Sequence, residues 1–271
     1  MLREHDIKIA LIARLHQKGM LDNAVLINEM VVAKWSRRAD LVLANGTLQA
    51  FEIKSDFDSL KRLDGQLETF NSRFEKVTVV CAPKFTTEVL SKVSNDTEVL
   101  EVSTNNNLIS FKVIQRGKTC IIKDKRVLLS FLLKKEIQSL LKHTTPAHSF
   151  NLDREALENE SLKLPTNAIR AFVLTTLKSR YQETSNQIKE KLANTPALLK
   201  NDLNLLSKKK LARSSQSAII QTASACDLIK PSNIIRLDFS KINKKYGETA
   251  AFAPVFAIKR LPSKKNQRQT N

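Results

Sequence analysis

The sequence has 271 residues and a formal charge of +18, from 45 Lys and Arg against 27 Asp and Glu, which favours nucleic acid over an anionic metabolite as the partner. Its five glycines form no Gly-x-Gly or Walker pattern, its three cysteines have no zinc or disulfide spacing, and no apolar run reaches the length of a membrane span. We therefore expect a cytoplasmic protein that uses no nucleotide cofactor and does not enter a membrane.

The N-terminal part of the chain combines helices with strands. An amphipathic helix is expected from Ile7 to Leu15. A second is expected from Asp58 to Phe74, where apolar residues recur at spacings of three and four. Runs of β-favouring residues predict four strands, near residues 25–33, 38–44, 48–54 and 76–82. The predicted fold is α/β, with the element order αβββαβ around a mixed central sheet.

Further elements extend this domain to a turn-rich segment, Pro146 to Asp153, which is the expected boundary. They are a helix near 86–93, strands near 98–103 and 108–115, and a helix over 125–142. We thus predict one domain over residues 1–145 and a mainly helical, basic region over 152–271.

The basic charge is concentrated at the C-terminal end. Residues 201–271 hold fourteen Lys and Arg against four Asp and Glu. We expect this region, including Lys208, Lys209 and Lys210, to contact phosphates non-specifically, and we expect disorder from about residue 262. A solvated tail that only aids solubility is the alternative.

A hairpin is predicted within Arg38–Asp56. A two-residue Asn-Gly turn would pair Asp40 with Phe51 and put Glu52 on the opposite face of the sheet. A three-residue loop, in which Gly46 supplies a positive φ, instead pairs Asp40 with Glu52. The apolar side chains of both strands then share the other face: Leu41, Leu43, Phe51 and Ile53. We predict this second register because it brings the two carboxylates together.

Lys54 follows Glu52 by two residues and projects from the same strand face. Carboxylate oxygens on neighbouring strands can hold Mg²⁺, with Mn²⁺ as a substitute, so this trio is typical of a metal-dependent phosphodiesterase. The helix that follows adds Arg62 and Gln66, which lie four residues apart and can both point toward a phosphate.

Several short motifs occur here in a characteristic order: Asn28-Glu29, Arg38 to Leu41, Phe51 to Asp56, Arg62-Leu63, and Gln66. In these motifs the chain resembles the PD-(D/E)XK nuclease superfamily, and most of all a small group of nuclease-like proteins from bacteria and mobile elements. The resemblance covers roughly residues 1 to 115. It implies a restriction-endonuclease-like core and Mg²⁺-dependent cleavage of DNA.

The resemblance implies a role for each residue of the central motif. Asp40 and Glu52 would bind the metal, helped by the backbone carbonyl of Ile53. Lys54 would orient or polarise the attacking water and stabilise the charge on the phosphorane.

The flanking residues have implied roles as well. Glu29 would be the additional acidic ligand, but the superfamily often places this acid on the first helix, so Glu4 is a rival for the role. Gln66 would contact the nucleic-acid backbone or the water, and Arg38 and Arg62 are candidate phosphate contacts.

Two functional classes are consistent with these residues. The favoured one is a Mg²⁺-dependent deoxyribonuclease whose basic C-terminal region binds the substrate. The other is a catalytically silent nucleic-acid-binding or partner-docking protein on the same fold. Simpler interpretations exist for single residues: a cross-strand ion pair for the Asp40, Glu52 and Lys54 trio, a surface charge for Glu29, and a solvated helix residue for Gln66. DNA versus RNA, the cleavage mode, and a homodimer or protein partner are left open.

Overall fold

The computed structural model describes residues 1–33, 36–106, 108–142, 152–195 and 197–206, together with two short strands at 234–236 and 256–258. Lys208, Lys209, Lys210 and the tail from about residue 262 lie outside the described residues, so the structure says nothing about those predictions. The sheet and its helices belong to one compact unit, Met1–Lys210.

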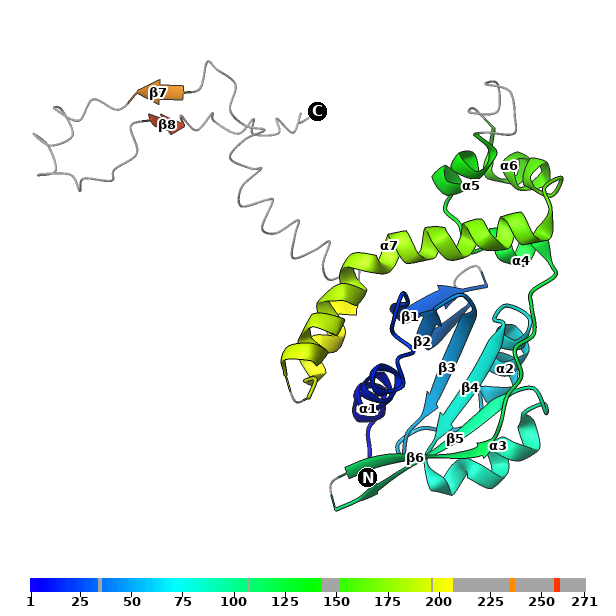
Figure 1. Ribbon diagram of the computed structural model, residues 1–271, viewed down its shortest axis with the longest axis vertical. Helices are drawn as coiled ribbons and strands as arrows, with labels where there is room; N and C mark the ends of the chain where they lie inside the picture. Colours follow the sequence, from blue (N-terminus) through cyan, green and yellow to red (C-terminus); the bar gives the residue numbers. More distant parts are fainter. Residues whose placement is uncertain are drawn as a thin grey trace, which may run out of the picture. The chain divides into compact units, whose positions relative to one another are not determined.

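A six-stranded mixed sheet forms the centre of this unit, with its strands side by side in chain order (Figure 1). β1 to β3 pair antiparallel, β3 to β5 pair parallel, and β6 is antiparallel to β5. The strands are β1 (Val25–Val32), β2 (Arg37–Ala44), β3 (Leu48–Lys54), β4 (Lys76–Cys81), β5 (Glu98–Asn105) and β6 (Leu108–Gln115). With α1 (Glu4–Gln17) and α2 (Leu63–Asn71), the first part of the chain has the predicted order αβββαβ.

The predicted hairpin register is confirmed from the Leu41–Phe51 pair to the loop. Leu41 pairs with Phe51 and Ala44 pairs with Leu48, which leaves a three-residue loop in which Gly46 has a φ of +107°. Side chains alternate between the two faces of a strand, so this register buries Leu41 and Phe51 in one core and Val42 in the other.

Helices cover both faces of the sheet. α1 packs on one face through Ile7 and Leu11, and α2 packs on the other through Leu67 and Phe70. The remaining helical elements are α3 (Thr86–Lys92), α4 (Lys125–Leu129), α5 (Lys134–Leu141), α6 (Arg154–Ser161), α7 (Thr166–Asn194) and the short turns η1 (Pro83–Phe85) and η3 (Lys200–Leu206).

Helix α7 passes around the β1 edge of the sheet and completes both cores. Ile169 and Val173, in its first half, pack in the core that contains α2, whereas Ile188 packs in the core that contains α1. Along the edge, the backbone N–H of Leu26 donates to Oγ of Ser185 at 3.0 Å. The compact unit therefore runs past the boundary that the sequence suggested at Pro146–Asp153, of which residues 146–151 lie outside the described residues.

Two predicted helices differ from the structure by more than a turn or by a break in the helix. The helix expected over 125–142 is two helices, α4 and α5. Between them Phe131 and Leu132 are buried, and α5 begins where the backbone N–H of Leu133 donates to Glu136 at 2.6 Å. The helix expected from Asp58 starts at Leu63, because Asp58 instead accepts hydrogen bonds from the N–H and hydroxyl of Ser55.

The second unit of the chain, Leu211–Asn271, holds β7 (Ile234–Arg236) paired antiparallel with β8 (Phe256–Ile258). These strands depart from the mainly helical character expected there, whereas the region from Arg154 to Leu206 is helical as predicted. Within the described parts of the chain, no helix has the length and apolar character needed to cross a membrane.

Candidate active site

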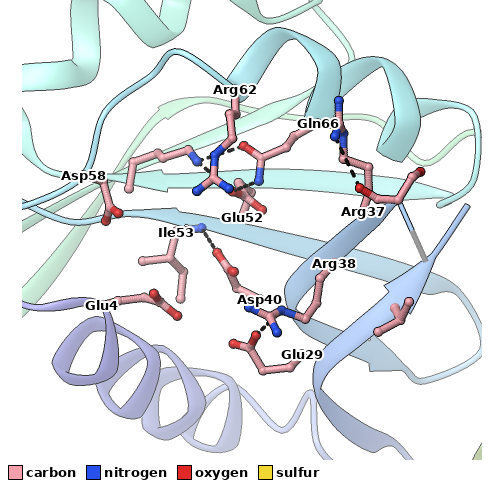
Figure 2. Close-up of a pocket in the computed structure, with 13 residues that line it drawn as sticks. Glu4, Glu29, Arg37, Arg38, Asp40, Glu52, Ile53, Asp58, Arg62 and Gln66 are labelled. Carbon is pink, nitrogen blue, oxygen red and sulfur yellow. Dashed lines mark hydrogen bonds and ion pairs between the residues drawn. The ribbon is translucent and has the colours of Figure 1, made fainter.

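Three carboxylates lie in a row across the first three strands. Continuing the β1–β2 register places Glu29 opposite Asp40, and continuing the β2–β3 register places Asp40 opposite Glu52. The β1–β2 ladder is interrupted at Glu29, whose φ is +57°, an uncommon value for a residue with a side chain. The row lies in a cavity of about 520 Å³ (Figure 2).

Asp40 is fixed by the neighbouring strand. Its Oδ2 accepts a hydrogen bond from the backbone N–H of Ile53 at 2.7 Å. Burial and the charge of Glu52 together raise the pKa of Asp40 well above its ordinary value, because the Ile53 bond offsets them only in part. The surroundings of Asp40 thus disfavour its charged form, which a bound cation would stabilise.

Glu52 is the most deeply buried of the three acids, with 2% of its surface exposed. Its Oε1 accepts hydrogen bonds from the Lys54 ammonium at 2.8 Å and from the side-chain amide of Gln66 at 2.5 Å. Its Oε2 is buried and has no hydrogen-bond partner among the residues that the structure describes. Burial raises the pKa of Glu52, although Lys54 and Gln66 counteract that shift.

Lys54 and Gln66 form a closed triangle with Glu52. Besides its contact with Glu52, the Lys54 ammonium donates to Oε1 of Gln66 at 2.9 Å. Gln66 comes from α2, so the helix behind the hairpin orients both the acid and the amine. The structure gives Gln66 these two contacts, and its expected contact with the nucleic-acid backbone or the water stays a prediction.

Glu29 and Glu4 form a second acidic cluster beside Asp40. One oxygen from each of the three lies within 4.8 Å of the others. Glu29 is already paired on both sides, with the Lys8 ammonium 2.7 Å from Oε1 and the Arg38 guanidinium 2.5 Å from Oε2. The structure therefore brings both rivals for the additional acid into the site.

Lys8 is a buried charged residue next to Glu29 that the sequence prediction missed. It lies on α1, is 3% exposed, and contacts Glu4 at 3.1 Å, Glu29 at 2.7 Å and Oδ1 of Asn28 at 3.0 Å. Burial lowers the pKa of Lys8, but Glu29, Asp40 and Glu4 outweigh it and leave that pKa above its usual value. The available signal was its spacing, four residues after Glu4 and four before the buried Ile12.

Basic side chains surround the acidic centre. Arg38, Arg62 and Arg37 all line the cavity, and the Arg38 side chain is 63% exposed. Figure 2 shows Arg62 above Gln66 and Arg38 beside Asp40 and Glu29. Arginine is well suited to phosphate through its fixed set of donors, so these side chains offer donors to a phosphate in the cavity.

Asp40 and Glu52 offer the oxygen donors that a hard divalent cation binds. Mg²⁺ takes oxygen ligands, and a buried carboxylate oxygen without a partner is costly unless something binds it. Asp40 and Glu52 supply oxygens, Oε2 of Glu52 lacks a partner, and Ile53 lines the cavity with its backbone N–H directed to Asp40. These residues fit such an ion.

Comparison with known proteins assigns the chain to a family. Residues 1–207 match the family model described as Bacteriophage P4 protein cII. The chain belongs to this family. Among its relatives, "Protein cII" of Enterobacteria phage P4 is 50% identical over 261 residues, which cover 96% of this chain and 98% of the relative. No solved structure matches the chain.

The family match covers the same part of the chain as the site and its support. It includes all residues that line the cavity and extends through α7 and η3, which end at Leu206. The structural unit and the family unit are thus nearly the same, and both include the helices after residue 152.

Proposed function

We propose that this protein is a metal-dependent nuclease that hydrolyses phosphodiester bonds in DNA, built on a PD-(D/E)XK-like core. The observation that carries the proposal is the Glu52 carboxylate, which is buried next to Asp40 and held at Oε1 by Lys54 and Gln66. Its Oε2 has no hydrogen-bond partner in the described parts of the chain. A purely structural carboxylate would be expected to have both oxygens satisfied.

The order of the elements supports the restriction-endonuclease-like part of the proposal. The hairpin β2–β3 places Asp40, Glu52 and Lys54 at one point of the sheet, and α2 contributes Gln66 from behind. These are the positions that the resemblance to the superfamily assigns to metal ligands, lysine and helix residue.

Asp40 and Glu52, with the backbone carbonyl of Ile53, would hold the ion. When bound, Mg²⁺ or Mn²⁺ would supply Lewis-acid stabilisation of negative charge on the phosphoryl oxygens. Arg38 and Arg62 would position the phosphate by contacts to its non-bridging oxygens.

Lys54 would act on the water and on the charge. In hydrolysis the water oxygen forms a bond to phosphorus, the bond from phosphorus to the leaving ester oxygen breaks, and that oxygen takes up a proton. The Lys54 ammonium, fixed by Glu52 and Gln66, would orient the water and stabilise the developing negative charge.

The basic charge of the chain supports DNA as the substrate. The formal charge of +18 is concentrated towards the C-terminal end, where it would contact phosphates independently of sequence. A DNA substrate also requires a compartment that contains DNA, so a cytoplasmic location is part of the proposal.

The test is cleavage by the purified full chain. Supercoiled, linear duplex, single-stranded and branched DNA are each incubated with Mg²⁺, Mn²⁺ or EDTA, using wild type and Glu52→Gln. Cleavage of any of these DNAs with Mg²⁺ or Mn²⁺, its absence in EDTA, and its loss in the variant are expected. DNA binding without cleavage in any metal would favour the catalytically silent alternative.

A further inference from the structure

We propose that the Lys8 ammonium occupies the place of a second cation, so that the active site takes one divalent ion. This inference rests on the proposed metal chemistry and adds to it the number of ions and the residue that sets that number. Lys8 would be a positioning residue that neutralises the acids beside Asp40.

The contacts of Lys8 carry the inference. Its Nζ lies 3.1 Å from an oxygen of Glu4, 2.7 Å from one of Glu29 and 3.0 Å from Oδ1 of Asn28. All three partners are oxygen atoms, which are the donors that a hard cation also requires. An ammonium in this position neutralises the negative charge of the carboxylates, as a bound metal ion would.

Lys8 is more deeply buried than its partner Glu4. The Lys8 side chain is 4% exposed, whereas the Glu4 side chain is 46% exposed. A buried ammonium keeps its charge only when anions surround it, and removal of that charge would leave Glu29 and Asp40 close together with less compensation. A cation from solution would then replace the lost positive charge, while Arg38 still pairs with Glu29.

The two halves of the site differ in what they offer an ion. On the Glu52 side, Oε2 is buried without a partner. On the Glu29 side, the carboxylate oxygens are paired with Lys8 and Arg38. One ion therefore fits between Asp40 and Glu52, and the place beside Glu29 is filled by the chain's own amine.

The experiment measures the number of metal ions bound per chain, not the rate of cleavage. Calorimetric titration of the full chain with Mn²⁺ is expected to give one ion per chain in wild type and two in Lys8→Gln, which keeps a polar, slightly shorter side chain but removes the charge. Lys8→Arg, which keeps the charge, is expected to give one. Combining Lys8→Gln with Glu29→Gln should return the count to one.

A matched control uses a lysine outside the cavity. Lys76 on β4 forms an ion pair with Glu98 at 3.0 Å, and its side chain is 20% exposed. Lys76→Gln makes the same chemical change and should leave the count at one. Circular dichroism checks that each variant is folded, and the wild-type and Lys8→Arg counts test the inference even when Lys8→Gln does not fold.

The outcomes separate this inference from the proposed function. Two ions in wild type, or a single ion in folded Lys8→Gln, would overturn the role of Lys8 while the metal chemistry stands. Wild type that binds no Mn²⁺ would overturn the metal chemistry and this inference with it.

Discussion

Oδ2 of Asp40 accepts a hydrogen bond from the backbone N–H of Ile53 at 2.7 Å, one step beyond the last paired residues of β2 and β3. This side-chain hydrogen bond takes the place of the backbone–backbone hydrogen bonds of the sheet, at the point where the two strands reach the cavity. The bond directs the carboxylate toward the strand that carries Glu52. It also makes Asp40→Asn an informative change, because the amide oxygen can accept the same bond without the charge.

Asp40→Asn should therefore abolish cleavage without loss of the fold. Loss of one ligand charge should reduce the rate by about 100-fold or more, while DNA binding stays near that of wild type. Rates on duplex DNA with Mn²⁺ provide the measurement. Asp64→Asn is the control, since Asp64 lies on α2, is paired with Lys92 and does not line the cavity. Equal activity in wild type and Asp40→Asn would refute the assignment of Asp40.

The same variant should change how stability depends on pH when metal is absent. The pKa of Asp40 is raised in the folded protein from an ordinary value of 3.8. A raised carboxyl pKa means that the folded state binds the proton more tightly, so stability is lost as pH rises through the folded pKa. The asparagine variant has no such group. In EDTA, its stability relative to wild type should increase from about pH 4 upward and then level off above that pKa.

Urea unfolding at a series of pH values measures this difference. The Asp64→Asn control should show no comparable trend, because Asp64 is exposed. A stability difference for Asp40→Asn that stays constant across the range would contradict the argument.

The hairpin register could be predicted from the sequence because, of the two registers considered, only one groups the apolar side chains on one face and the two carboxylates on the other. Pairing Asp40 with Glu52 also places Leu41 and Phe51 in one core, so the apolar pattern and the site depend on the same choice. The buried stripe of α2 followed from its spacing in the same way. These features are encoded by residues close together in the chain.

The rest depends on contacts between distant segments. Lys8 reaches Glu29 from a separate helix, and its spacing from Ile12 on α1 indicates a buried position but not its partner on β1. The contribution of α7 was missed for a similar reason, since Ser185 and Arg170 contact residues more than a hundred positions earlier in the chain. Turn residues near Pro146 were a poor guide to where the compact unit ends.

Lys54→Met should separate catalysis from metal binding. The change keeps the volume of the side chain but removes the ammonium that contacts Glu52 and Gln66. We expect the cleavage rate to fall by about two to four orders of magnitude, with the Mn²⁺ count unchanged, since Gln66 still donates to Oε1 of Glu52. Disappearance of Mn²⁺ binding in a folded Lys54→Met protein would mean that the lysine is structural.

Arg170→Met should destabilise the whole unit. Arg170 on α7 contacts both oxygens of Glu75, at 2.5 and 2.9 Å, and the carbonyl of Gly46 at the hairpin loop at 2.8 Å. The Glu75 side chain is 1% exposed, so removing its partner leaves a buried charge and should cost about 3–5 kcal/mol in urea unfolding.

The exposed pair of Lys163 and Glu160 supplies the comparison for this variant. Lys163→Met should cost less than about 1 kcal/mol, because exposed ion pairs contribute little. Similar losses in the two variants would show that α7 is not essential to the hairpin. The same reasoning predicts that a fragment ending at residue 145 will not fold stably, whereas one ending at residue 206 will.

Truncation after Leu206 should weaken DNA binding and leave the chemistry intact. Leu203 and Leu206 are buried in the core that contains α1, so the cut must follow η3 to preserve the fold. The removed segment holds all fourteen Lys and Arg of residues 201–271. Each lost phosphate contact should reduce the slope of log affinity against log salt by about 0.9 for duplex DNA.

Fluorescence anisotropy at several salt concentrations gives this slope, and circular dichroism verifies that the truncated chain is folded. Cleavage at saturating DNA should stay close to that of the full chain, because every residue lining the cavity lies before the cut. An unchanged slope would assign the segment to a solvated tail or to a protein partner. The phosphate contacts would then be sought among Arg37, Arg38 and Arg62, whose substitution should lower the slope instead.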